Sequence, residues 1–169
     1  MSHFSAITTK LVDRDCLVQG LRSVLAAVGI EQPAIEVHDV AQLLENSYAP
    51  NDRAYGNVIV RRHCIPRPGW RDGKAAIDIG FALQSDGTYA AVCDAWDIED
   101  NAIGQHFGGR NPLTAFMGAV ATQHNIAYVK AQYPQVDWAY SELVETTDGL
   151  QLTLTQKPQV MDLAMAGGI

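Results

Sequence analysis

The 169-residue sequence is poor in cysteine and in positive charge. Its three cysteines, Cys16, Cys64 and Cys93, form no C-x-x-C pair, a pattern that argues against a disulfide framework and against a zinc ribbon or finger. Lysine and arginine number 12 against 19 acidic residues, which gives a net charge of -7. A field of this sign repels phosphate backbones and anionic membrane surfaces, so nucleic-acid binding by the whole surface is disfavoured.

The sequence also lacks long hydrophobic runs. The longest uncharged stretch, residues 111–129, contains Asn111, Gln123 and Asn125, and this many amides argue against a membrane helix. Residues 1–15 hold no apolar run of signal-peptide length. We therefore expect a cytoplasmic protein, or one of the host cytoplasm if a phage encodes it, with reduced thiols and no membrane partner.

The overall composition is typical of a globular domain. Hydrophobic residues make up 47% of the chain and charged residues 18%, which excludes a disordered or collagen-like chain. The length suits one domain with its own core. We expect a single domain over residues 1–157 and a flexible tail over residues 158–169, whose end is rich in glycine and alanine.

Two helices are indicated by apolar residues at three- and four-residue spacing. The first follows Asp13, a suitable N-cap, and ends at Gly29. The second begins with Asn111 as N-cap and Pro112 as its first residue, and it ends before Pro134. Both sets of boundary residues agree with the apolar spacing between them.

Alternating β-branched and aromatic residues predict strands around these helices. The expected strands cover residues 3–11, 57–63, 75–83 and 88–96, and a hairpin joins 138–146 to 150–156. Residues 30–55 carry weaker strand signals that read as two short elements. The order of strand, helix, three strands, helix and two strands predicts an α+β fold. We expect a two-layer sandwich with a mainly antiparallel sheet and both helices on one face.

Several sequence blocks carry a family resemblance. They are the opening M-S-H-F-S at residues 1–5, the D-I-G-F block at 78–81, and D-A-W at 94–96. Over residues 1–157 the chain resembles the hypothetical chloroplast reading frame thirty-five family, small proteins of plastids, cyanobacteria, other bacteria and phages; residues 62–75 look like an insertion. The resemblance implies no reaction. It implies an adaptor role, because bacterial relatives accompany ATPases of the AAA class, which makes such an ATPase an expected protein partner.

One segment departs from the acidic mean. Residues 61–74 contain five basic residues and one acidic residue, together with His63. Guanidinium groups bind phosphates and carboxylates bidentately, and tryptophan offers a stacking face. We therefore expect this loop to contact a protein partner or single-stranded nucleic acid. The predicted contact residues are Arg61, Arg62, Arg67, Trp70 and Arg71. The alternative is a solvated loop that pairs with the chain's own acidic surface.

A second function is suggested by acidic and aromatic residues near strand ends. A pocket formed by His3, Asp78, Asp94 and Trp96 would make the protein a small-ligand-binding protein or an enzyme, and Asp78 is expected to hydrogen bond to His3 or Trp96. The sequence carries no EF-hand loop and no H-E-x-x-H. We therefore expect no metal, no cofactor and no catalytic residue, which favours a non-enzymatic role.

Two weaker features remain as alternatives. Glycines precede Arg110 and the N-cap Asn111, an arrangement that suits either an anion site or a plain loop. Cys16, at a helix start, and Cys64, after a histidine, each meet half of the requirement for a catalytic thiol.

Overall fold

The computed structural model describes residues 4–135, 137–147 and 149–158. The chain divides into two compact units, one that ends at Tyr128 and one that begins at Val129. The single domain expected over residues 1–157 stays a prediction. The tail expected over residues 158–169 lies outside the described residues, apart from Pro158.

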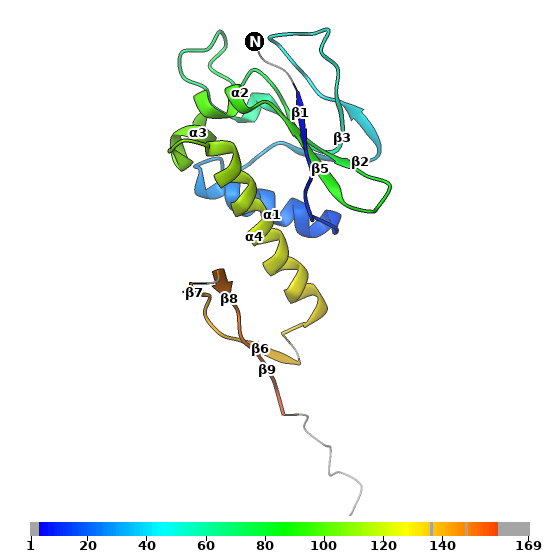
Figure 1. Ribbon diagram of the computed structural model, residues 1–169, viewed down its shortest axis with the longest axis vertical. Coiled ribbons are helices and arrows are strands. Elements are labelled where there is room, and N and C mark those ends of the chain that lie inside the picture. Colours follow the sequence, from blue (N-terminus) through cyan, green and yellow to red (C-terminus); the bar gives the residue numbers. More distant parts are fainter. Residues whose placement is uncertain (1–3, 136, 148, 159–169) are drawn as a thin grey trace, which may run out of the picture. The chain divides into compact units, whose positions relative to one another are not determined.

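The first unit is built on a five-stranded antiparallel sheet with the order β1-β5-β4-β3-β2 (Figure 1). Its strands are β1 (Ser5–Ile7), β2 (Ile35–Leu43), β3 (Tyr55–Val60), β4 (Ile79–Leu83) and β5 (Tyr89–Cys93). The predicted run of three adjacent antiparallel strands is confirmed, because β3 pairs with β4 and β4 with β5. The sheet is therefore antiparallel throughout, as the α+β prediction requires.

The edge strand β2 replaces two elements expected in residues 30–55. It pairs with β3 on both sides of a register shift between Val37 and Gln42. The amide of Asn57 donates to the carbonyls of His38 and Asp39 at 3.3 and 3.2 Å. This contact satisfies carbonyls that the shifted ladder leaves without strand partners, so one bulged strand carries both of the separate sequence signals.

The two long helices are confirmed with their predicted caps. They are α1 (Arg14–Ala27) and α4 (Pro112–Gln132). Asp13 Oδ1 accepts a hydrogen bond from the Cys16 amide at 2.8 Å, and Asn111 Oδ1 accepts one from the Thr114 amide at 3.0 Å. Each cap satisfies an amide that has no partner within the helix.

Two short helices between the sheet and α4 were not predicted. They are α2 (Ala95–Asp100) and α3 (Ala102–Phe107), and a 3-10 turn, η1, covers Arg62–Cys64. A side-chain oxygen of Asp94 caps α2, and a side-chain oxygen of Asn101 caps α3. Helices of six residues span less than two turns, so their apolar spacing gives no recognisable period.

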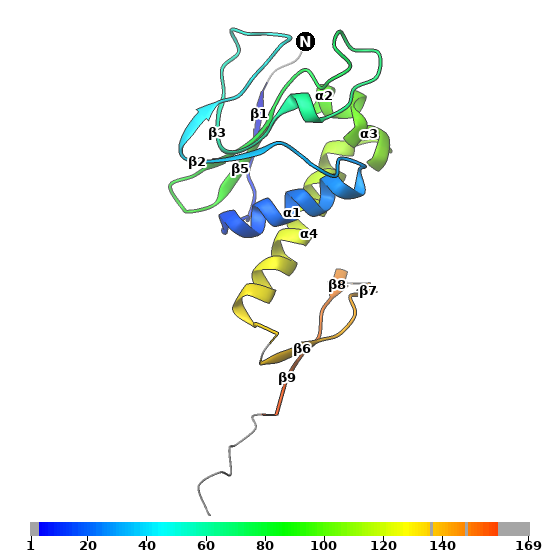
Figure 2. The same cartoon turned by 180° about the vertical axis from the view of Figure 1, so that it is seen from behind.

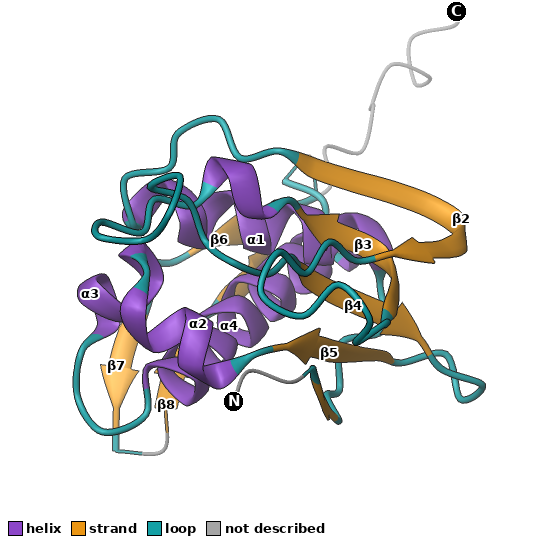
Figure 3. Ribbon diagram, turned by 90° about the horizontal axis from the view of Figure 1, so that it is seen from above, coloured by secondary structure: helices purple, strands orange, loops and turns teal. Residues whose placement is uncertain are grey.

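The main core lies between the sheet and the helices α1 and α4, which cover the same face (Figure 3). The largest side chains of this core with almost no exposure are Leu11, Leu17, Leu21, Leu25, Ile65, Ile79, Phe81, Ile98, Ile103 and Phe116. The two helices cross closely at Gly20 (Figure 2). A Cβ on this residue would lie 2.9 Å from the backbone nitrogen of His124, so glycine permits the close approach. The expected two-layer arrangement is thus present in the first unit.

The opposite face of the sheet carries a smaller apolar cluster. Leu44, Ile59 and Val92 are buried there, and Phe4 packs against them. A Cβ on Gly80 would lie 2.6 Å from a methyl group of Leu44, so glycine lets the segment after β2 rest directly on β4. This contact places residues 44–54 beside the loop that follows β3.

The second unit contains two short antiparallel ladders. The strand β6 (Trp138–Tyr140) pairs with β9 (Leu154–Gln156), and β7 (Val144–Thr146) pairs with β8 (Gly149–Gln151). The expected C-terminal hairpin is therefore present, interrupted between its outer and inner pairs. Across the described part of the chain, no helix is both long enough and apolar enough to cross a membrane.

Candidate interaction surface and the ion pairs beneath it

Three of the five basic residues in segment 61–74 form ion pairs with carboxylates of the same chain. The pairs are Arg61 with Glu36 and Asp78, Arg62 with Glu45 and Asp72, and Arg67 with Asp97 and Asp100, at 2.5–3.2 Å. Arg62 and Arg67 are buried. For these three residues the geometry matches the alternative prediction, in which the loop pairs with acidic residues of the same chain. Their predicted contact with a partner is not supported by any free guanidinium group.

Asp78 joins three segments of the first unit. Its carboxylate accepts hydrogen bonds from the Glu45 amide at 2.7 Å, the Arg61 guanidinium at 2.7 Å and the Arg62 amide at 2.6 Å. The side chain is completely buried. Trp96 is not among these three partners, and His3 lies outside the described residues. Asp78 therefore has a structural role in this arrangement, since these hydrogen bonds come from backbone amides and from an arginine with which it forms an ion pair.

Asp94 and Asp97 also serve the backbone. Asp94 Oδ1 accepts hydrogen bonds from the Trp96 and Asp97 amides at 2.8 and 3.2 Å, which caps α2. Asp97 accepts from the Ala76 and Ile77 amides at 2.8 and 3.2 Å and pairs with Arg67. Burial nevertheless raises the pKa of Asp97. Among the described residues, no cluster of histidine, cysteine and acidic side chains is arranged to hold a metal ion.

Next to these ion pairs lies a group of three adjoining rings that we call the aromatic surface, formed by Tyr48, Trp70 and Trp96. Trp70 is partly buried. The ring centroids are 5.6–6.1 Å apart, and the ring planes are inclined to one another by 42–80°. Tyr48 is 42% exposed and Trp96 38% exposed. The three rings come from the segment after β2, the loop after η1, and α2. Folding therefore brings together aromatic side chains that are far apart in the sequence.

The guanidinium of Arg67 contacts both tryptophans of the aromatic surface. It lies 4.4 Å from the Trp70 ring centroid and 4.1 Å from that of Trp96. Asp97 and Asp100 hold the same guanidinium at 2.6 and 2.7 Å. Cation–π contacts of a desolvated arginine stabilise both rings in place. The buried ion pair thus fixes the positions of the two tryptophans.

A local turn holds Tyr48, the remaining member of the aromatic surface. Asn46 Oδ1 accepts hydrogen bonds from the amides of Tyr48 and Ala49 at 3.1 and 2.8 Å, which orders the turn that presents Tyr48. Arg71 is exposed and lies 5.3 Å from the Trp70 ring centroid. Sequence reasoning identified Trp70, Arg71 and Trp96 but not Tyr48. The asparagine turn was the only local signal of its position.

The ion pair at the sheet edge gives a pH-dependent prediction. Hydrogen bonds from Arg61 and then His38 lower the pKa of Glu36 from its ordinary 4.5 to about 2. A carboxyl group whose pKa is lower in the folded protein than in the unfolded chain stabilises the folded state at any pH above its unfolded-chain pKa. This stabilisation is lost as the pH falls through the pKa of the folded protein. Urea unfolding measures the free energy of unfolding of wild type and of Glu36→Gln. Wild type is expected to exceed the variant by the largest amount near neutral pH. This difference should shrink between about pH 4.5 and pH 2. A difference independent of pH would contradict this account of Glu36.

The cysteine thiols are held in their protonated form. Burial raises the pKa of Cys16 to about 11 and that of Cys93 to about 12, and it also raises the pKa of Cys64. The thiolate is the nucleophilic form of cysteine. These environments therefore do not activate Cys16 or Cys64 for catalysis.

Comparisons with known proteins add no relative. No protein-family model matches the chain, and neither the curated proteins nor the solved structures contain a significant match. The resemblance to the chloroplast reading frame family stays a prediction.

Proposed function

We propose that the protein is a non-enzymatic interaction module that binds an extended, proline-containing segment of a partner protein on the aromatic surface. The observation that carries this proposal is a group of three adjoining rings in which Tyr48 and Trp96 are exposed and Trp70 is partly buried, with a buried arginine in contact with both tryptophans. Fixed aromatic side chains contribute large contact area at little cost in conformational entropy, and they dominate protein interfaces.

The inclination of the rings favours a peptide over stacked bases. Rings inclined by 42–80° do not offer the parallel faces on which successive bases stack. Proline-rich segments in the polyproline II conformation dock between aromatic side chains of this kind, and they lose little entropy on binding.

The charge distribution supports the same choice. Ion pairs within the chain neutralise Arg61, Arg62 and Arg67. The exposed cations left in the segment are Arg71 and Lys74, in a chain of net charge -7. Binding to nucleic acid requires many phosphate contacts, whereas two cations suit one acidic residue in the bound peptide. The AAA-class ATPase implied by the resemblance is one protein in which to seek such a segment.

The test is an NMR titration of the ¹⁵N-labelled full chain with a proline-rich peptide that contains one glutamate. We expect the indole resonances of Trp70 and Trp96 to shift in a saturable manner. Trp96→Ala and Tyr48→Ala should each weaken binding at least about tenfold, because truncating a buried aromatic at an interface centre typically removes about 2 kcal/mol. Thermal unfolding of each variant shows whether the fold is kept.

The matched control is Tyr55→Ala, since Tyr55 is 49% exposed but lies outside the aromatic surface. It should bind the peptide as tightly as wild type. An oligothymidine strand forms the second arm of the titration. Shifts of both indole resonances with the oligonucleotide and not with the peptide would overturn the proposal in favour of nucleic acid, and no shift with either would overturn it outright.

A further inference from the structure

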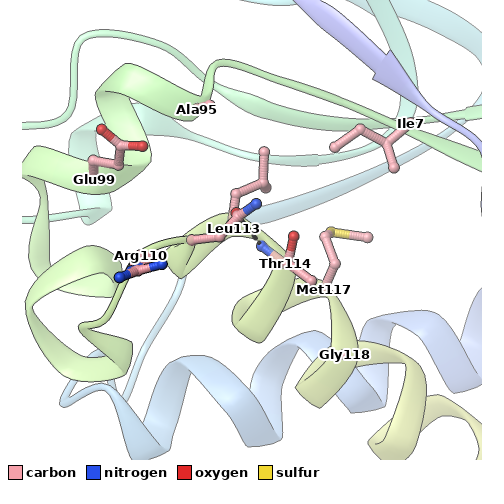
Figure 4. A pocket seen from close by; sticks show the side chains of 9 residues that line it. Ile7, Ala95, Glu99, Arg110, Leu113, Thr114, Met117 and Gly118 are labelled. Carbon is pink, nitrogen blue, oxygen red and sulfur yellow. Dashed lines mark hydrogen bonds between the residues drawn. The ribbon is translucent and has the colours of Figure 1, made fainter.

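A separate cavity lies on the other side of α2, between β1 and the start of α4. It has a volume of about 560 Å³ and is lined by Ile7, Ala95, Glu99, Arg110, Asn111, Leu113, Thr114, Met117 and Gly118 (Figure 4). A volume of this size falls within the range of small-molecule sites. None of its lining residues belongs to the aromatic surface or to the ion pairs beneath it.

Gly118 is the feature of this cavity that the fold does not explain. Glycine inside a helix costs about 1 kcal/mol relative to alanine. At Gly104, which also lies in a helix, a Cβ would clash, because it would lie 2.3 Å from the carbonyl oxygens of Ile98 and Glu99. A Cβ on Gly118 would meet nothing within 4 Å. No contact in the described structure requires glycine there, and its missing side chain leaves the cavity open.

The chemistry of the lining is divided. Glu99 and Arg110 lie on one side of the view in Figure 4, and Ile7 and Met117 lie on the other. Within the described residues, Glu99 and Arg110 take part in none of the ion pairs, in contrast to Arg61, Arg62 and Arg67. One unpaired anion and one unpaired cation therefore border an apolar floor.

The loop before α4 is built to present Arg110. Gly108 and Gly109 adopt positive φ angles of 58° and 75°, a conformation that other residues rarely take. The N-cap contact of Asn111 with Thr114 fixes the next residues. The backbone on both sides of Arg110 is thus specified by residues suited to that conformation.

From these observations we infer that the cavity binds a small zwitterion with an apolar body, the chemistry of a free apolar amino acid or a dipeptide. Arg110 pairs with the carboxylate, Glu99 pairs with the ammonium group, and Ile7, Leu113 and Met117 contact the apolar side chains. Met117 suits such a floor, because the flexible thioether adapts to ligands of different shape. The site is independent of the partner segment proposed above.

The experiment uses leucyl-leucine as the probe and the ¹⁵N-labelled full chain. We expect saturable shifts of the Leu113, Thr114 and Gly118 amides. N-acetylation of the probe removes the ammonium group and amidation removes the carboxylate, and each should weaken binding about tenfold. Glu99→Gln should abolish discrimination against the acetylated probe alone. Arg110→Gln should abolish discrimination against the amidated probe alone.

Gly118 provides a steric test with a matched control. Gly118→Phe should fill the cavity and prevent binding, whereas Gly118→Ala should keep the fold and still bind the probe. Equal affinity for the free and capped probes would overturn the inference. So would discrimination that survives both charge substitutions, or an absence of shifts at millimolar leucyl-leucine. Because the two charge variants alter exposed residues, the test holds even if Gly118→Phe fails to fold.

Discussion

Replacing Arg67 with alanine is expected to lower the free energy of unfolding by about 3–5 kcal/mol, because Asp97 would remain buried without its cation. Arg67 and Asp97 are 4% and 3% exposed at their side chains. Guanidinium chloride unfolding monitored by circular dichroism measures the loss. Arg71→Ala is the control, since Arg71 is exposed and should leave stability near the wild-type value. A loss below about 1 kcal/mol for Arg67→Ala would contradict the role of the pair.

The same substitution should also disturb the aromatic surface. Arg67 contacts the rings of Trp70 and Trp96, so its removal frees both rings and weakens peptide binding even under conditions in which the variant is folded. A variant in which all four arginines of residues 61–74 are replaced would therefore report on folding and not on partner binding. Arg71→Ala and Trp96→Ala test binding without removing the buried ion pairs.

Replacing Asp78 with alanine is expected to cost about 3–5 kcal/mol as well, because it removes the acceptor of two backbone amides and the buried ion-pair partner of Arg61. Urea unfolding measures the effect. Asp39→Ala is the control: Asp39 pairs with Arg14, but its side chain is 94% exposed, and exposed pairs contribute little. Equal losses for the two variants would contradict the structural role of Asp78.

A double variant separates the contribution of the Arg61 contact. If the Arg61–Asp78 pair is coupled as its 2.7 Å distance indicates, the combined loss in Arg61→Ala, Asp78→Ala should be smaller than the sum of the single losses. Additive losses would show that the two side chains stabilise the fold independently.

Sequence patterns predicted the elements whose signals are local. Asp13 and Asn111 cap the long helices as expected, because capping depends on residues within one turn. The helices α2 and α3 escaped prediction because each spans six residues. The strand β2 read as two elements because its bulge interrupts the alternation, and the side chain that completes the bulge, Asn57, comes from β3.

At the candidate site, too, contacts between distant segments of the chain could not be predicted from the sequence. The excess of arginine in residues 61–74 looked like a contact surface, but the carboxylates that pair with Arg61 and Arg67 include Glu36 and Asp97, which lie far away in the chain. Trp70 and Trp96 were singled out from sequence for different reasons, one as part of the basic loop and the other as part of a pocket. Only the fold places them together with Tyr48.

The most direct test of the aromatic surface uses tryptophan fluorescence. The chain contains three tryptophans, so Trp138→Phe leaves Trp70 and Trp96, both on that surface, as the only tryptophan emitters. Titration of this variant with the proline-rich peptide should give a saturable change in emission, and adding Tyr48→Ala should weaken the affinity at least about tenfold. An emission that does not respond at millimolar peptide, or a response that Tyr48→Ala leaves unchanged, would contradict the assignment of this surface as the binding site.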